Sequence, residues 1–138
     1  MIRVVLDTNV LVSAVISPNG PNARLFDLII SKQLRPCLTD AVLEEFSAVF
    51  EYERLQHLDR RRIARLRGLL ERTGVKVRAS GRLKISAHEP DNRIYECAAA
   101  ANADYIVTEN ARHFGEPYKT TKIITARALL RLLNAEET

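Results

Sequence analysis

Acidic and amide side chains occur at four places in this sequence with the types and spacing that a divalent-metal site needs. Asp7 opens an Asp-Thr-Asn run after an apolar stretch, Glu44 and Glu45 are adjacent, Asp91 follows a proline, and Thr108 opens a Thr-Glu-Asn run after a later apolar stretch. Converging carboxylates stay ionised together only when a cation is present. Oxygen ligands suit Mg²⁺ or Mn²⁺ rather than zinc. Such ions bind phosphate oxygens and activate water, so the pattern indicates phosphodiester hydrolysis without a Ser, Cys or His nucleophile.

The elements that must position these side chains alternate between strands and helices, which is the pattern of an α/β protein. Strands joined by helices form a parallel sheet with right-handed crossovers. Thr39 or Asp40 can cap one helix, and Asp59 can cap another that ends at Gly74. We expect strands at Ile2–Leu6, Leu34–Leu38, Val75–Val77, Asp104–Thr108 and Lys122–Thr125. We expect helices at Asn22–Lys32, Asp40–Phe50, from Asp59 through Arg72, and at Asn92–Ala101 and Arg127–Leu133.

Asp7 and the Thr-Glu-Asn run should stand at the same edge of this sheet. Both follow a predicted strand directly. Ligands of parallel α/β sheets gather beyond the carboxyl ends of the strands, where the strand order reverses. Asp, Thr and Asn also favour turns, so a turn or helix-capping role for Asp7 is the alternative. We expect Asp7 to bind metal, supported by Thr8, Asn9, Thr108, Glu109 and Asn110.

Helical phase selects among the acids that lie on helices. At about 100° per residue, Glu45 falls at the edge of the apolar face of its helix, whereas Glu44 faces away from the core. In the later helix, Asp91 extrapolates to the buried side and Glu96 to the opposite side. N-capping is the alternative role for Asp91, and a helix N-terminus would also help to keep this acid ionised. The catalytic and metal-binding set that we expect is Asp7, Glu45 and Asp91.

The positive charge of the chain is concentrated in its middle. The formal net charge is +4, and residues 54–84 carry 11 basic and 2 acidic side chains, while segments 1–53 and 85–138 are net acidic. A basic stripe suits a polyanion such as RNA. A solvated helix face is the alternative. The candidate RNA-binding residues are Arg60, Arg61, Arg62 and Arg65.

The composition is that of an ordinary globular protein, with 46% apolar and 28% charged residues. A chain of 138 residues fits one domain. Cys37 and Cys97 lie in apolar surroundings without metal-ligand spacing, so we expect buried, reduced thiols. No apolar run is long enough to span a bilayer, and the N-terminus does not resemble a signal peptide. We therefore expect a cytoplasmic protein without membrane contact.

Four motifs together resemble those of PIN-domain ribonucleases, and in particular the toxins of prokaryotic toxin–antitoxin systems related to VapC. They occupy residues 5–14, 38–46, 89–98 and 103–110. The resemblance implies a three-layer α/β/α sandwich with a central parallel sheet of four to five strands, in a single domain over residues 1–138. It also implies an RNase that uses Mg²⁺ or Mn²⁺, with Asp7 and Asp91 as the first and third acids and Glu44 or Glu45 as the second. Asn9 matches an asparagine that buttresses the first acid by hydrogen bonding.

The segment after the fourth predicted strand departs from the family pattern. An acid is frequent there in the family, but Asn110 and His113 occupy the corresponding positions. One metal ion is therefore expected, and a second depends on what Glu109 and Asn110 do. A surface or capping role is favoured for His113.

The leading hypothesis is a metal-dependent endoribonuclease that is the toxin of a type II toxin–antitoxin pair. The expected partners are RNA, a cognate antitoxin and a second copy of the chain in a homodimer. The alternative is a catalytically weak PIN-fold module that binds RNA. A phosphotransferase with Asp7 as phosphate acceptor is a third hypothesis, disfavoured because Asn9 stands where a second acid would be needed.

Overall fold

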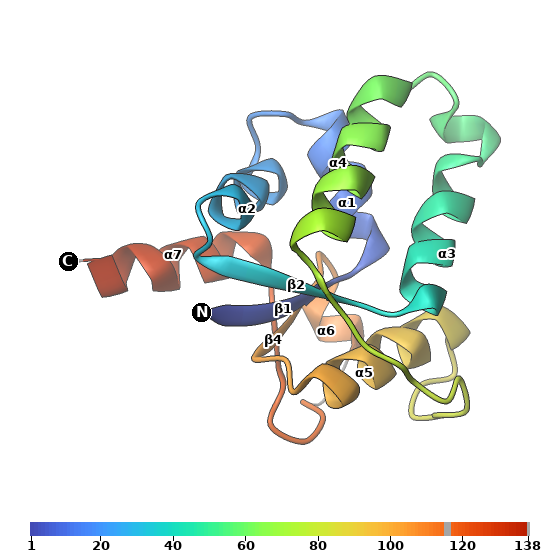
Figure 1. Ribbon diagram of the computed structural model, residues 1–138, viewed down its shortest axis with the longest axis vertical. Helices are drawn as coiled ribbons and strands as arrows, with labels where there is room; N and C mark the ends of the chain where they lie inside the picture. Colours follow the sequence, from blue (N-terminus) through green and yellow to red (C-terminus); the bar gives the residue numbers. More distant parts are fainter. Residues whose placement is uncertain (115–116, 138) are drawn as a thin grey trace.

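The computed structural model describes residues 1–114 and 117–137, without the side chains of His113 and of residues 135–137 (Figure 1). The described strands form one five-stranded sheet in the order β3-β2-β1-β4-β5, and every pair is parallel. This confirms the expected α/β class and parallel sheet. The strands are β1 (Ile2–Leu6), β2 (Leu34–Leu38), β3 (Val75–Lys76), β4 (Tyr105–Val107) and β5 (Lys122–Ile124).

Helices cover both faces of the sheet, which gives the three layers expected from the sequence. The helix α5 packs against β1, β2 and β4, and Figure 1 shows it below the sheet, with α2 and α4 above and in contact with β2. The helices are α1 (Thr8–Ile16), α2 (Pro21–Ile30), α3 (Asp40–Phe50), α4 (Arg60–Thr73), α5 (Glu89–Ala101), α6 (Ala111–Phe114) and α7 (Ala126–Glu137), and a 3₁₀ turn, η1, spans Glu53–Leu55.

Capping residues set the ends of the helices around the site. The Thr39 hydroxyl accepts from the N–H of Val42 at the start of α3, and Asp59 caps α4. Of the two caps considered for α3, Thr39 is therefore the one used. At the end of α4, a Cβ on Gly74 would lie 2.5 Å from the Leu70 carbonyl oxygen, so only glycine allows this close approach.

The helix α1 was not expected from the sequence. Its buried residues lie on one side, but the apolar Val12 and Ile16 lie on the other side, so no amphipathic period stands out. The short elements η1 and α6 were also missed. The helix α5 begins at Glu89, three residues before the predicted start, because a proline fits the first turn of a helix.

The strand order reverses between β1 and β4. Leu6 pairs with Val107 in the register of these two strands, so Asp7 and Thr108 are the next residues on each. The helix α3 contacts α1 of the upper layer and α5 of the lower one, and in Figure 1 it stands at the end of the sheet to which β2 points. The crevice at the switch point is thus walled by elements from both layers.

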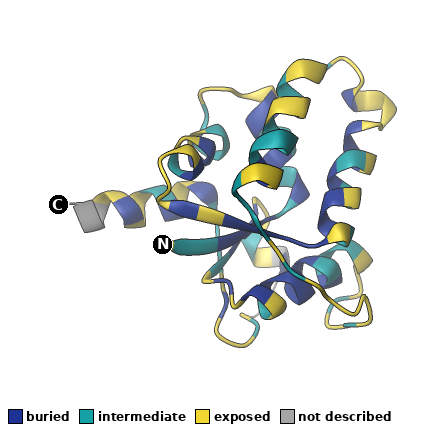
Figure 2. Ribbon diagram, in the orientation of Figure 1, coloured by how far each residue is buried: buried dark blue, intermediate teal, exposed yellow. Residues whose placement is uncertain are grey.

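The core lies between the sheet and the helices, where β1, β2 and the inner sides of α3 and α5 are buried (Figure 2). Cys37 and Cys97 are both free and buried, as expected. Burial raises the pKa of the Cys97 thiol to about 12, so it is inert as a nucleophile. No helix among the described residues has the length and apolar character required to cross a membrane.

Candidate active site

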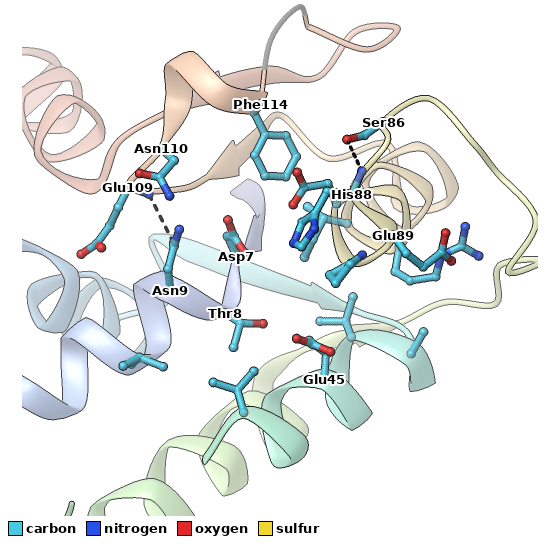
Figure 3. A pocket seen from close by; sticks show the side chains of 18 of the residues that line it. Asp7, Thr8, Asn9, Glu45, Ser86, His88, Glu89, Glu109, Asn110 and Phe114 are labelled. Carbon is cyan, nitrogen blue, oxygen red and sulfur yellow. Dashed lines mark hydrogen bonds and ion pairs between the residues drawn. The ribbon is translucent and has the colours of Figure 1, made fainter. Parts of the chain in front are cut away.

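A pocket of about 930 Å³ opens at the carboxyl edge of the sheet (Figure 3). Its walls come from the start of α1, one side of α3, the segment that leads into α5, and the residues after β4. Asp7, Glu45 and Asp91 all line it, and the buried Thr8 does so as well. The fold therefore brings together, from three separate elements, the three acids selected from the sequence.

Asp7 is fixed by the strand beside it. Its N–H donates to the Val107 carbonyl at 2.9 Å, which continues the ladder between β1 and β4 by one residue. The Thr108 hydroxyl then donates to Asp7 Oδ2 at 2.8 Å. Asp7 occupies the N-cap position of α1, but its carboxylate makes no capping hydrogen bond. Asp7 also lines the pocket.

The surroundings of Asp7 favour its neutral form. Burial raises the pKa of the carboxyl above its ordinary value. The hydrogen bond from Thr108, the nearby N–H groups of Thr8 and Asn9 and the charge of His88 all lower this pKa, without reversing the shift. The ionised carboxylate is thus incompletely compensated, and a bound cation would supply what is missing.

Glu45 lines the pocket from α3, whereas Glu44 is exposed and does not line it (Figure 3). The helical phase therefore identified which of the two acids lines the pocket. Burial raises the pKa of Glu45, His88 lowers it, and the negative charge of Asp7 raises it further.

Asp91 lies in the first turn of α5, where His88 is the N-cap residue. The alternative that Asp91 caps this helix is therefore wrong, because the helix begins earlier than expected. Burial raises the pKa of Asp91, with an opposing effect from His88 and a further increase from Asp7. The negative charge of Asp7 therefore acts on both of the other carboxyls, and raises the pKa of each.

The donor set has the right chemistry for a hard divalent cation. All three groups are carboxylates whose pKa is raised by burial, so a cation would lower the cost of ionising them together. Oxygen-only ligation fits Mg²⁺ or Mn²⁺. Among the described residues, however, no group of three or more His, Cys, Asp or Glu side chains is arranged to hold a metal ion. Binding an ion would therefore require these carboxylates to move closer together.

The side chain of Asn9 is linked to Asp7 through Thr108. Asn9 Nδ2 donates to Thr108 Oγ1 at 3.4 Å, and Asn9 Oδ1 accepts from the N–H of Glu109 at 3.3 Å. The N–H of Asn110 also donates to Thr108 Oγ1, at 3.2 Å. Thr108 is fully buried. Thr108 therefore links the end of β4 to the Asp7 carboxylate.

Glu109 does not complete the carboxylate set. Its Oε1 atom accepts hydrogen bonds from Ser13 and, at 3.0 Å, from Asn22 Nδ2. Figure 3 shows its carboxylate turned away from Asp7. Glu109 thereby joins the end of β4 to α1 and α2, and Asn110 is left as the neutral oxygen donor on this side of the pocket. The geometry gives no support to a second metal ion here.

His88 is one of the pocket residues that were not predicted from the sequence. It lines the pocket, and its ring points toward Asp7 (Figure 3). Its charge lowers the pKa of Asp7, Glu45 and Asp91 alike. The available signal was its place directly before the Glu-Pro-Asp start of α5. His113, the imidazole considered from the sequence, has its side chain outside the described part of the structure.

A buried asparagine on α5 holds the segment that carries His88. Asn92 is only 2% exposed. Its Oδ1 atom accepts from the N–H groups of Ile85 at 2.8 Å and Ser86 at 2.7 Å, and its amide donates to the Ser86 carbonyl at 2.9 Å. The Ser86 hydroxyl in turn accepts from the N–H of His88. The backbone that precedes the pocket is thus tied to α5.

Glu96 anchors the earlier part of the same segment. The prediction that it faces away from the buried side was wrong, because residues 77–88 fold over that side of α5 and leave Glu96 8% exposed. Its Oε1 atom accepts from the Ser80 hydroxyl at 2.8 Å and from the N–H groups of Arg82 and Leu83. Burial raises the pKa of Glu96, but these hydrogen bonds and the charge of Arg93 outweigh it and leave the pKa lowered.

The four arginines selected as RNA-binding candidates divide into two kinds. Arg60 donates to the carbonyls of Phe50 and Leu55, and Arg62 donates to the Ala14 carbonyl at 3.2 Å, so both hold neighbouring elements in place. The side chains of Arg61 and Arg65 are exposed and make no hydrogen bond or ion pair with the described residues. Only this second pair is fully available to a polyanion.

Comparison with known proteins matches this sequence to a family. A family model described as PIN domain matches residues 3–112, which include Asp7, Glu45 and Asp91. An uncharacterized protein of Methanocaldococcus jannaschii is 27% identical over 104 residues, covering 74% of this chain and 67% of that protein.

Proposed function

This chain belongs to the PIN-domain family, whose members are generally nucleases, and we propose that it is a Mg²⁺- or Mn²⁺-dependent endoribonuclease. One observation carries the proposal. Three carboxylates from β1, α3 and α5 line one pocket, and burial raises the pKa of each. A protein that keeps three such acids in one pocket bears a cost that a bound cation removes.

The pocket residues have separate roles in the proposed reaction. Asp7, Glu45 and Asp91 would hold one ion, which when bound polarises a phosphodiester and activates water. Thr108 keeps Asp7 oriented through its 2.8 Å hydrogen bond. His88 faces the same space and would donate a hydrogen bond to a phosphate oxygen. These groups hydrolyse RNA without a covalent intermediate on the protein.

The test is cleavage of a fluorescently labelled single-stranded RNA with Mg²⁺ or Mn²⁺. We expect activity that EDTA abolishes and that Asp7→Asn reduces by at least about a hundredfold. Asp27→Asn, the same change at an exposed acid on α2, should have no effect. Cleavage that persists in EDTA, or in Asp7→Asn, would contradict the proposal.

A second candidate is a PIN-fold module that binds RNA without cutting it. It is favoured by the absence, among the described residues, of a preformed metal-binding group, and by Asn110 at a position that is often acidic in the family. RNA binding with no cleavage under any divalent ion would support this function over the first.

We also propose, from the resemblance of residues 5–14, 38–46, 89–98 and 103–110 to VapC-related toxins, that the chain is a cytoplasmic toxin. Its partners would be RNA, a cognate antitoxin and a second copy of itself. Induced expression should arrest bacterial growth, whereas Asp7→Asn should not, and co-expression of an adjacent gene's product should restore growth. Light scattering of the purified protein tests the homodimer. Growth unaffected by the wild-type chain would contradict the toxin role.

A further inference from the structure

An exposed tyrosine stands on the rim of the pocket. Tyr52 is 47% exposed, and of the large apolar side chains exposed in the described part of the chain it is the one that lines the pocket. Glu45, Val49 and Tyr52 form a stripe of pocket-lining residues spaced three and four apart, along one side of α3 and the turn after it. Tyr52 therefore lies roughly 10 Å along the helix direction from Glu45. An isolated surface tyrosine needs no explanation, but one at this place does.

The turn that carries Tyr52 is held at both ends by Arg60. Arg60 Nη1 donates to the Phe50 carbonyl at 2.8 Å, and Arg60 Nη2 donates to the Leu55 carbonyl at 2.9 Å. Within the turn, the N–H of Leu55 donates to the Tyr52 carbonyl at 2.9 Å. Leu55 is itself buried. The backbone under Tyr52 is thus fixed before any ligand arrives, which reduces the entropy lost when the ring is covered.

A positive charge lies over one face of the Tyr52 ring. The guanidinium of Arg54 is 5.7 Å from the centroid of Tyr52, and Arg54 also lines the pocket. An aromatic face next to an arginine is the combination that binds unpaired nucleotides, because the ring stacks on a base and the guanidinium meets a phosphate. A base held in a duplex offers no free face to such a ring.

We propose that Tyr52 and Arg54 form a subsite for one unpaired RNA base and its adjacent phosphate, next to the carboxylate pocket. The identity of the substrate rests on the proposed ribonuclease function. The subsite makes single-stranded RNA the substrate class, because the strand must present one unstacked base to Tyr52 while a neighbouring phosphate reaches Asp7, Glu45 and Asp91.

The experiment measures binding of a short labelled single-stranded RNA by fluorescence anisotropy in EDTA. Tyr52→Leu should weaken binding by about tenfold, whereas Tyr52→Phe, which keeps the ring, should bind like the wild type. Arg54→Gln should weaken binding and reduce the slope of log K against log salt by about 0.7. Arg127→Gln, at an exposed arginine on α7 that does not line the pocket, is the matched control and should change binding less than Arg54→Gln. An RNA with a single abasic site at the stacked position should bind the wild type more weakly than the intact RNA does. Tyr52→Leu should bind both RNAs equally.

Several results would overturn the subsite. One is unchanged binding of RNA by Tyr52→Leu, and another is a loss of affinity in Tyr52→Phe as large as in Tyr52→Leu. A third is an equal loss of affinity in Tyr52→Leu when the RNA is a duplex. The last is weaker binding of the abasic RNA than of the intact RNA by Tyr52→Leu. Melting temperatures of all variants show whether any loss reflects unfolding. Failure of the proposed function is distinguishable, since Tyr52-dependent binding without cleavage in Mn²⁺ contradicts the nuclease but leaves the subsite standing.

Discussion

Asp7 is an acid in surroundings that penalise its charge. The Thr108 hydroxyl and the charge of His88 offset part of the effect that burial has on the pKa of Asp7, and this pKa nevertheless stays raised. Residues placed for function at a cost in stability are common in active sites, and replacing them often stabilises the fold. The carboxylate of Asp7 should behave in this way in the absence of metal.

We predict that Asp7→Asn raises the melting temperature by a few degrees at neutral pH in EDTA. An acid with a raised folded pKa binds more protons in the native state, so its ionisation destabilises the protein as pH rises above about 4. The stability difference between the variant and the wild type should therefore be smallest near about pH 3. It should grow as the pH rises to the pKa of Asp7 in the folded protein. Thermal melts across this pH range measure it. A variant that melts below the wild type at pH 7 would show that the charge of Asp7 is fully compensated.

Added Mn²⁺ should reverse the order of these two proteins. A ligand that binds only the folded state stabilises it by mass action, about 2.7 kcal/mol at a hundred times Kd. We expect Mn²⁺ to raise the melting temperature of the wild type and to leave Asp7→Asn almost unchanged. Equal shifts in both proteins would place the ion elsewhere.

His88 was found only in the structure, although neighbouring acids were found from the sequence. Glu45 could be separated from Glu44 because the residues of α3 have a clear apolar face, and phase then decides direction. His88 lies just before a helix, where no periodicity exists. Its position depends on the hydrogen bond that its N–H donates to the Ser86 hydroxyl, and on the one that the Ser86 N–H donates to Asn92 Oδ1. Those contacts join residues whose pairing the sequence does not reveal.

At the scale of elements, the site depends on how residues 77–88 are attached to α5. Asn92 and Glu96 lie one helical turn apart, and each accepts two backbone N–H groups of this segment. Neither side chain lines the carboxylate pocket. Their role is to fix the backbone that delivers His88 to it.

We predict that Glu96→Gln destabilises the protein by about 1–3 kcal/mol, because the charge-assisted hydrogen bonds that the buried carboxylate accepts are lost. The lowered pKa of Glu96 adds stability above its unfolded pKa, and this is lost as pH falls through the folded value. The loss caused by the substitution should therefore shrink in acid. Hydrogen exchange should accelerate first at the N–H groups of Arg82 and Leu83. Glu44→Gln, at an exposed glutamate, is the control, and an equal effect there would refute the anchoring role.

Most elements were predictable because their capping residues and apolar periods are local. β1, β2 and α3 have the predicted bounds, and Asp59 caps α4 as expected. The helix α1 was missed because its apolar residues are spread around most of the helix, although only one side of it is buried, so no amphipathic pattern stands out in the sequence. Glu96 was misplaced because a segment distant from its own helix turn covers it.

Over the whole molecule, the basic charge in residues 54–84 serves two purposes. Some arginines tie elements together, as Arg60 does for the turn after α3, and others face solvent. Net charge of a segment cannot separate these uses, so the sequence identified the basic region correctly but not the roles of its members.

We predict that replacing Arg61 and Arg65 together by Ala weakens RNA binding and lowers the salt slope by about 1.4, or 0.7 for each lost phosphate contact. Because their side chains are exposed, the melting temperature should change little. Arg60→Ala should instead lower the melting temperature, since the hydrogen bonds to the Phe50 and Leu55 carbonyls are lost. Binding titrations at several salt concentrations, with melts alongside, distinguish these effects. An unchanged slope in the double variant would assign both arginines to solvated surface.

The hydrogen bond between Asp7 and Thr108 joins residues 101 positions apart in the chain. During translation, the first acid of the pocket therefore leaves the ribosome long before the residue that orients it. A chain still being synthesised has β1, α1 and α3 but lacks β4, so it cannot assemble the pocket. If the chain cuts RNA, its own messenger is protected from each nascent copy until Thr108 has emerged and can pair with Asp7.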